Sequence, residues 1–272
     1  MKPTMPKLSI IIPWSNRPEI KKTLLQNRAI FQNYDLEIIV VCCAGDFDQL
    51  QELFVDHYLP EVRWLNLPNE HFNKSLALNI GGSVARSDKL FFLDTDVLLK
   101  YDFLAEALHV LDGSTFVTVD RVFESHPTRR VTGSRLKDFA NSIEFVTDDE
   151  RVVRVERNRI RFSDGSRSAP GLILLSKAHF YQVQGMNAEL KRWGWEDIDL
   201  MVRLQLLLGL ERRQLGAVVH LSHGDDVRNL VNEPRPRSEF RNSSISMANY
   251  QQGNYYGTYQ QNIKQWKDFI KE

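Results

Sequence analysis

Acidic residues occur in two short groups whose spacing suits chemistry on a charged substrate. Asp94 and Asp96 stand two residues apart, directly after the apolar run FFL. Carboxylates so placed can reach one divalent cation directly or through water, and hard cations such as Mg2+ and Mn2+ prefer oxygen ligands of this kind. A D-x-D pair is also common as a solvated charge pair, so its position at the end of an expected strand is what favours a metal site.

The second acidic group is Glu196, Asp197 and Asp199, which follows Trp193-Gly194-Trp195 and opens an amphipathic segment. Acids at a helix start can simply complement the positive end of the helix dipole, which also favours an ionised Asp197. That interpretation leaves the tryptophans unexplained, because two large rings flanking a glycine in a turn are costly to expose. Aromatic faces beside a carboxylate can hold a sugar ring and let the carboxylate take its proton.

Two histidines follow the apolar run AVV, at His220 and His223. A lone histidine is more often a structural polar group than a metal ligand, but the aspartate pair favours a ligand role for one of these. Residues three apart on a strand point to opposite faces of the sheet, so we expect only one of the two to face the cation.

Length and composition indicate a globular α/β domain. The chain has 272 residues, of which 42% are hydrophobic and 26% charged, and 35 basic side chains balance 35 acidic ones. The charge balance selects neither nucleic acid nor an anionic membrane.

The adjacent Cys42 and Cys43 are expected to be reduced thiols. No apolar run approaches the roughly 20 residues of a membrane span, so we expect no transmembrane segment and a cytoplasmic protein, or a catalytic piece of a larger one.

Strands and helices are expected to alternate through the first half of the chain. The expected strands are 8–12, 36–41, 62–65 and 89–93, and the expected helices are 19–30, 46–58 and 73–85. This order predicts a mostly parallel sheet, with ligands bound beyond the carboxyl ends of the strands. The segments PWSNR, CCAGD and DTD each follow an expected strand, and so would lie at that edge.

The second half is expected to add further strands and helices and then a tail. We expect helices at 102–111, 177–183 and 196–208, strands at 115–119, 172–175 and 217–221, and a strand or hairpin at 151–162. Five arginines between 151 and 161 could face an anionic glycan, although a solvated strand face is favoured. The Asn-, Ser- and Gly-rich stretch over about 225–257 predicts a loosely ordered, lid-like segment before a final helix near 260–270.

Three ordered segments together resemble glycosyltransferase family 2 over roughly residues 8–226: LSIIIPWSNR, then NKSLALNIGG before FFLDTDVLL, then APGLILLSKAHFYQVQGMN leading to RWGWEDIDLMVRL. The second half is also similar to the C-terminal module of beta-1,4-galactosyltransferases and chondroitin-synthase-type polymerases. The resemblance implies a GT-A (Rossmann-like α/β) fold, with a mostly parallel central sheet flanked by helices, a small extra β element and a C-terminal tail. It also implies a metal-dependent, inverting transfer of a hexose-type sugar from a UDP-sugar to a hydroxyl of a glycan or other acceptor.

The same resemblance assigns roles to individual residues. It implies that Asp197 is the catalytic base and Glu196 a ligand of the acceptor hydroxyl. It implies that Mn2+ or Mg2+ is held by Asp94, Asp96 and a histidine, for which His223 is preferred because of the following Gly-Asp-Asp. The implied nucleotide contacts are Pro13, Ser15, Arg17, Asp46, Lys74, Asn79 and Thr95. The implied acceptor and sugar contacts are Trp193, Gly194, Trp195, Gly171, Gly185 and Asn187.

Two positions depart from the family pattern. CCAGD stands where many relatives have Asp-Asp-Gly-Ser, which makes Asp46 the candidate substitute for the base-contacting acid. Trp195 stands where a glycine normally leaves room, so we expect a different acceptor shape. We expect a GT-A domain over 1–224, with a nucleotide-binding half to about 112 and an acceptor-binding half from about 113, followed by a lid-like loop and helix over 225–272.

Two alternative functions are weighed against this one. A sugar-1-phosphate nucleotidyltransferase would share the α/β layout and the metal-binding acids, but PWSNRPE lacks the glycines that its first loop would need. A catalytically inactive sugar-binding module is disfavoured because both the D-x-D and the Glu-Asp pair are present.

Overall fold

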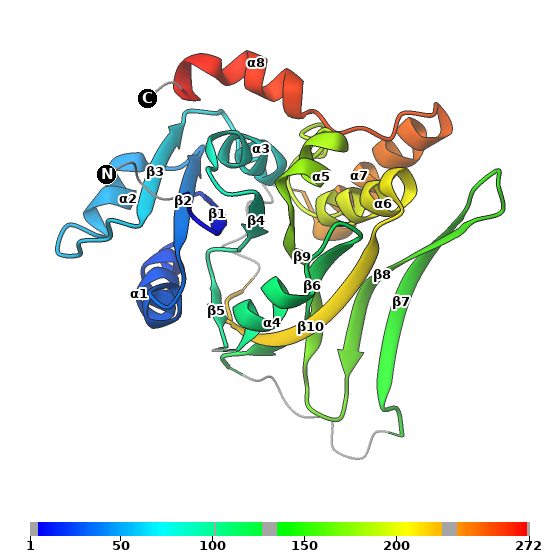
Figure 1. Cartoon of the computed structure of the whole chain (residues 1–272), viewed down its shortest axis with the longest axis horizontal. Coiled ribbons are helices and arrows are strands. Elements are labelled where there is room, and N and C mark those ends of the chain that lie inside the picture. The colour runs from blue at the N-terminus through cyan, green and yellow to red at the C-terminus, as the bar shows by residue number, and fades with distance from the viewer. Residues whose placement is uncertain (1–4, 101, 127–134, 225–232, 271–272) are drawn as a thin grey trace.

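Buried β-branched runs form the parallel half of one large sheet. The computed structural model describes residues 5–100, 102–126, 135–224 and 233–270 (Figure 1). Strand β1 (Leu8–Trp14) lies between β2 (Leu36–Cys43) and β4 (Lys89–Phe92), and β3 (Val62–Leu67) pairs with the other side of β2, all in parallel. All seven residues of β1 are buried, as expected for a strand covered on both faces.

The other half of the sheet is mixed. Strand β9 (Arg167–Ser176) runs antiparallel to both β4 and β6 (Thr115–Glu124). Strand β10 (Glu211–His220) is parallel to β6, and the short β5 (Val97–Leu99) is antiparallel to β10. The sheet is therefore parallel from β3 to β4 and mixed beyond it, because β9 enters between β4 and β6 in the opposite direction while β10 is again parallel to β6.

A long hairpin extends from the sheet beside β9 (Figure 1). It consists of β7 (Asp138–Val146) and β8 (Val152–Arg161). Only β8 was expected, because β7 is exposed along most of its length and has no continuous apolar run. The arginines of this region have partners: Arg154 contacts Glu144 on β7 and Arg161 donates to Asp120 on β6 at 2.6 Å. These arginines therefore stabilise the hairpin through ion pairs. The pairing favours a structural role over the binding of an anionic glycan.

Helices cover both faces of the sheet. The helices α1 (Glu19–Phe31), α2 (Phe47–Glu52) and α4 (Phe103–Val110) share one apolar core with the sheet. On the other face lie α3 (Lys74–Val84), α5 (Lys177–Gln182), α6 (Glu196–Leu208), α7 (Arg235–Gln251) and α8 (Tyr259–Ile270). Asp46 caps α2 and Asn73 caps α3 as expected, although α2 ends at Glu52 rather than near Tyr58.

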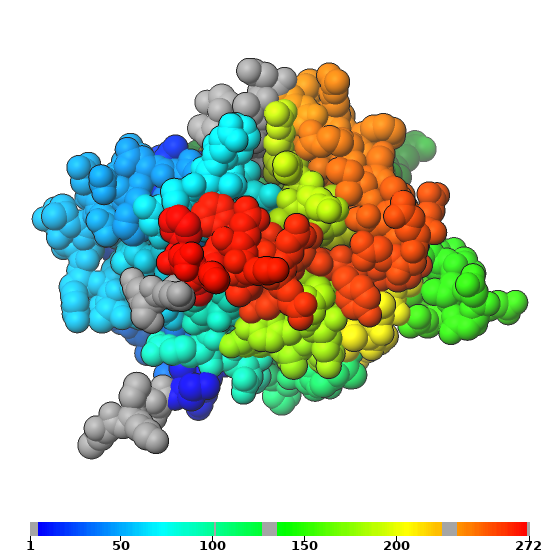
Figure 2. All heavy atoms as spheres, turned by 90° about the horizontal axis from the view of Figure 1, so that it is seen from above, coloured from blue at the N-terminus to red at the C-terminus, as the bar shows by residue number. Residues whose placement is uncertain are grey.

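The C-terminal region is more ordered than its composition indicates. The expectation of a loosely ordered segment is wrong for residues 235–251, which form α7, whereas residues 225–232 lie outside the described residues. The sequence does not predict α7 because Ser238, Asn242 and Ser246 occupy its buried side. The segment therefore lacks the helical spacing of apolar residues. Helix α8 lies over α3, and Figure 2 shows it as the outermost layer of that face. Within the described ranges no helix is both long and apolar enough to span a bilayer.

Candidate active site

Helix α1 fixes the loop that carries the D-x-D pair. The Thr23 hydroxyl donates to the carbonyl of Thr95 at 2.7 Å. The Asn27 amide donates to the carbonyl of Val97 at 2.9 Å and accepts from the backbone N–H of Leu99 at 2.8 Å. Both α1 side chains are fully buried. Sequence reasoning missed them, although polar residues on the buried side of an amphipathic helix were a usable signal.

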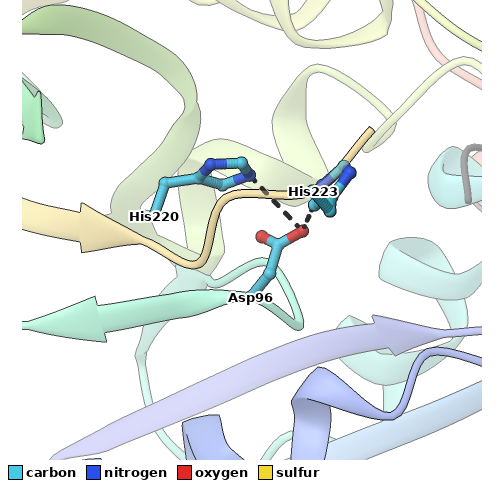
Figure 3. A group of neighbouring side chains, drawn as sticks. All are labelled: Asp96, His220 and His223. Atoms are coloured by element: carbon cyan, nitrogen blue, oxygen red, sulfur yellow. Dashed lines mark hydrogen bonds and ion pairs between the residues drawn. The ribbon is translucent and has the colours of Figure 1, made fainter. Parts of the chain in front are cut away.

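Asp96 and both histidines converge at the ends of β10 and β5. The Oδ2 atom of Asp96 lies 3.2 Å from Nε2 of His223 and 3.6 Å from Nε2 of His220 (Figure 3). The ligand atoms of these three residues all lie within 4.8 Å of one another. The expectation that only one histidine faces the site is wrong, because β10 ends at His220 and the alternation of a strand does not extend to His223.

The surroundings keep Asp96 ionised and orient His220. Burial alone would raise the pKa of Asp96, but hydrogen bonds from His220 and His223 and the charge of Arg17, whose Nη2 is 3.1 Å away, hold this pKa far below its usual range. The Nδ1 of His220 lies 2.7 Å from Oε2 of Glu124. A carboxylate on the far nitrogen of an imidazole is the usual way in which a metal-binding histidine is held. Glu124 was not among the predicted site residues.

Lys74 joins the D-x-D loop to the acid pair of α6. Its Nζ lies 3.2 Å from Oδ1 of Asp94 and 3.1 Å from Oδ1 of Asp197. A Cβ on Gly171 would lie 2.4 Å from Oδ2 of Asp197, so only glycine allows β9 to pass this carboxylate. The structure therefore brings together both sequence-predicted acidic motifs, Lys74 and Gly171. Asp94 contacts Lys74 and lies outside the cluster formed by Asp96 and the histidines.

Burial raises the pKa of both acids of the pair. It raises the pKa of Glu196 to about 8, with the neighbouring Asp197 charge adding to the effect. Burial also raises the pKa of Asp197, which the Lys74 ammonium opposes. This direction is contrary to the expectation from the helix dipole alone, because desolvation disfavours the charged form of a carboxyl group. Glu196 Oε2 is also buried, and no described residue forms a hydrogen bond with it.

One of the predicted nucleotide contacts, Asp46, lines a hollow at the ends of β2 and β3. The cavity measures about 460 Å³ and is lined by residues 44–48, Asn66, Pro68 and Asn69. Asp46 lies on its rim but uses its carboxylate to accept from the N–H of Gln49. The Ser15 hydroxyl donates to the carbonyl of Ala44 at 3.2 Å. Pro13 lies within the buried β1, and Thr95 is 7% exposed beside Asp96.

Three predicted contacts have structural positions instead. Asn79 is fully buried, and its amide donates to Met186 O at 2.9 Å and to Asn262 Oδ1 at 2.7 Å. A Cβ on Gly185 would lie 2.4 Å from Asn79 Oδ1, so this glycine serves close packing. Asn187 is 3% exposed and accepts from its own loop, at Glu189 N–H. In the structure Asn79 and Gly185 pack between α3, the loop after α5 and α8, and Asn187 holds its own loop; their place near a substrate stays a prediction.

The tryptophan turn is held in an unusual conformation. Gly194 and Trp195 have φ values of +92° and +77°, in the region that side chains rarely adopt. The guanidinium of Arg235 lies 4.1 Å from the Trp193 ring and that of Arg157 lies 5.0 Å from the Trp195 ring. Both rings are therefore partly covered by cations from neighbouring elements.

Solved structures of glycosyltransferases share this fold. A Drosophila beta-1,4-galactosyltransferase 7 mutant in complex with manganese, UDP-Gal and xylobiose is 15% identical, covering 88% of this chain and 78% of that chain, with a TM-score of 0.51. A Pyrobaculum calidifontis mannosyltransferase in complex with GDP-Man and Mn2+ is 14% identical, covering 97% and 76%, with a TM-score of 0.53. S. aureus TarS 1–349 in complex with UDP-GlcNAc is 13% identical, covering 89% and 66%, with a TM-score of 0.53. Sheet, helices and site define a protein with the GT-A fold.

The sequence itself identifies the family. The chain belongs to glycosyl transferase family 2, whose model matches residues 9–180. A second model, described as the N-terminal domain of galactosyltransferase, matches residues 148–224 and so includes the acid pair and both histidines. The chain is therefore a glycosyltransferase with a GT-A fold, as the sequence patterns had indicated.

Proposed function

We propose that this protein transfers a hexose-type sugar from a UDP-sugar to a hydroxyl of a glycan or other acceptor, with inversion at the anomeric carbon. The bridge formed by Lys74 between Asp94 and Asp197 carries the proposal, because it places the D-x-D loop and the acid pair in one site. A donor diphosphate near the loop and an acceptor near the acids would then meet within that site.

The proposed cation site is Asp96, His220 and His223. One carboxylate oxygen and two imidazole nitrogens suit Mn2+ among other divalent ions, and three protein ligands leave positions for diphosphate oxygens. When bound, the cation would stabilise the negative charge of the departing UDP. The manganese named with the galactosyltransferase and mannosyltransferase structures supports this choice. We propose that Asp94, which is 41% exposed, contributes through a water molecule or the donor.

Asp197 is the proposed general base. It would take the proton from the acceptor hydroxyl as that oxygen attacks the anomeric carbon, in a single displacement that needs no covalent intermediate. Glu196, whose pKa burial raises to about 8, carries a proton near neutral pH. Its buried, unpartnered oxygen would then pair with an acceptor hydroxyl, which fits the proposed role in acceptor binding. Lys74 would balance the charge of Asp197 until the diphosphate arrives.

The donor nucleotide is proposed to extend from the cation site to the hollow at the ends of β2 and β3. Arg17 lies beside Asp96, where its guanidinium could pair with phosphate oxygens. Asp46, Asn66 and Asn69 line the hollow and offer polar groups to a base. Trp193 and Trp195, at the start of α6, would shape the acceptor side of the site.

A donor screen tests the proposal. Purified protein would be incubated with Mn2+ and each of a set of UDP- and GDP-sugars, and release of the nucleoside diphosphate would be measured. We expect Mn2+-dependent release from at least one UDP-sugar, and an inverted anomeric centre when the product is examined by NMR. Release of pyrophosphate from a sugar-1-phosphate and UTP would instead indicate the nucleotidyltransferase. Binding of a sugar with no release from any donor would indicate an inactive sugar-binding module.

A further inference from the structure

One side of α7 presents a row of polar residues to the turn that carries the acid pair. Ser238, Asn242, Ser246 and Tyr250 are spaced four apart, which puts them on one side of the helix, and each is at most 9% exposed. A buried helix side is usually apolar, and buried polar groups need partners. All four find theirs in the segment 191–199, which contains Glu196 and Asp197.

The first two residues of the row hold the backbone of the tryptophan turn. The Ser238 hydroxyl donates to Trp193 O at 2.8 Å and accepts from Trp193 N–H at 3.2 Å. The Asn242 amide donates to Lys191 O at 3.1 Å and to Gly194 O at 2.7 Å. Main-chain groups before and within the Trp193–Trp195 turn are therefore bound by α7 side chains.

The other two hold the first turn of α6 through Asp199. This carboxylate is 1% exposed, and its Oδ1 accepts from Ser246 at 2.9 Å and from Tyr250 at 2.7 Å. Its Oδ2 accepts from Arg203 at 2.8 Å, and Arg203 in turn donates to two backbone carbonyls of the loop after α5. Asp199 thus links α6 to its neighbours on two sides.

Backbone strain explains why the turn needs these contacts. Arg192 and Trp195 both have positive φ, +70° and +77°, and neither is a glycine. Residues in this region persist only where the surrounding structure holds them. Glu196 and Asp197 lie between the contacts of Asn242 to Gly194 and those of Ser246 and Tyr250 to Asp199, so α7 holds the backbone on both sides of the acid pair.

We propose that α7 is a positioning element, whose polar row sets the place of Asp197 and Glu196 relative to Lys74 and the donor. This inference rests on the proposed function for the role of Asp197. The four α7 residues and Asp199 do not act on substrate themselves; they act through the acids. Loss of their contacts should slow transfer while leaving the donor and cation site, on the other side of Lys74, intact.

Asn242→Ala and Tyr250→Phe test the positioning role, with Ser244→Ala as the matched control. Ser244 is an exposed serine of the same helix whose hydroxyl donates to Phe240 O within α7. Transfer would be measured at saturating donor and acceptor, with Mn2+-dependent UDP affinity by calorimetry and backbone amide exchange by mass spectrometry. We expect kcat to fall about 10- to 100-fold in Asn242→Ala, with donor KM and UDP affinity within twofold of the unaltered protein. Tyr250→Phe, which keeps the ring, should show a smaller fall in kcat, and Ser244→Ala none.

Faster amide exchange confined to residues 191–199 should accompany the loss of kcat. Unchanged kcat in both variants despite that local loosening would overturn the positioning role. So would a parallel loss of kcat and UDP affinity with faster exchange throughout, which would indicate general destabilisation. Absence of transfer by the unaltered protein would contradict the proposed function, and amide exchange would still report whether α7 holds the turn.

Discussion

Four aspartates in the two acidic motifs differ in their neighbours and therefore in what they can do. Asp96 contacts two histidines, whereas Asp94 and Asp197 both contact Lys74. Both oxygens of Asp199 are occupied by hydrogen bonds and the side chain is buried, so it has no access to an acceptor proton. Sequence spacing alone could not separate these roles, because each depends on residues distant in the chain.

The convergence of His220 and His223 predicts similar losses from the two alanine variants. Each removes one of the three candidate ligand atoms that lie within 4.8 Å of one another. We expect His220→Ala and His223→Ala each to weaken Mn2+-dependent UDP binding by about 10- to 100-fold, as measured by calorimetry. The exposed His109 on α4 provides the control, and His109→Ala should have no effect. If UDP binding weakened in only one of the two histidine variants, the result would support the expectation from strand alternation that a single histidine contacts the cation.

The buried Glu196 predicts a pH-dependent gain in stability from Glu196→Gln. Its pKa is about 8 in the folded protein against an ordinary 4.5, so the folded state holds a proton that the unfolded chain releases. The contribution of Glu196 to stability is therefore complete below about pH 4.5 and is lost as the pH rises towards 8. Relative to the unaltered protein, Glu196→Gln should melt a few degrees higher at pH 8 than at pH 5.

Scanning calorimetry at the two pH values measures this difference. Glu189→Gln, at an exposed glutamate of the preceding loop, is the control and should show no such pH dependence. A melting temperature of Glu196→Gln that tracks the unaltered protein at both pH values would show that Glu196 is ionised in the folded state.

Individual elements of this fold support the site through buried polar side chains. Helix α1 holds the D-x-D loop with Thr23 and Asn27, and α7 holds the acid pair with its polar row. Such residues interrupt the apolar period by which a sequence predicts helices. For α1 the remaining apolar spacing was sufficient to predict the helix, whereas for α7 it was not.

Removing the Asn27 contacts should disturb the proposed cation site from a distance. Asn27→Ala leaves the buried carbonyl of Val97 and N–H of Leu99 without their partner, at a cost of about 1–3 kcal/mol each in unfolding free energy. Because these groups follow Asp96, we also expect weaker Mn2+-dependent UDP binding. Chemical denaturation and calorimetry measure the two effects, with Gln26→Ala at an adjacent exposed position as control. Lower stability with unchanged UDP affinity would mean that α1 supports the fold and not the loop geometry.

Across the whole molecule, the part that the sequence predicted well is the parallel half of the sheet. Strands β1, β2 and β4 are continuous apolar runs, and Asp46 and Asn73 mark the helix starts between them. The second half of the sheet was harder to predict, because β7 is exposed and β9 is antiparallel to its neighbours. The acidic motifs were recognisable as local patterns. Other parts of the site depend on contacts between residues distant in the chain and were not recognisable. These are Glu124, Thr23, Asn27 and the convergence of both histidines on Asp96.

The site lies where the two halves of the sheet meet. Lys74 at the start of α3 comes from the half expected to bind the nucleotide, and Asp197 at the start of α6 comes from the half expected to bind the acceptor. The division of the chain near residue 112 stays a prediction, but the ion pair between these two helix starts shows why the halves would act as one catalytic unit.

The most direct test of the account is the transfer rate of Asp197→Asn. Asparagine keeps the size of the side chain and removes its affinity for a proton. At saturating UDP-sugar, Mn2+ and acceptor, we predict that kcat falls by about 10²- to 10⁴-fold. Mn2+-dependent UDP affinity, measured by calorimetry on the same preparation, should be retained because Asp197 lies outside the Asp96–His220–His223 cluster. A near-normal kcat with saturating acceptor would contradict the assignment of Asp197 as the base.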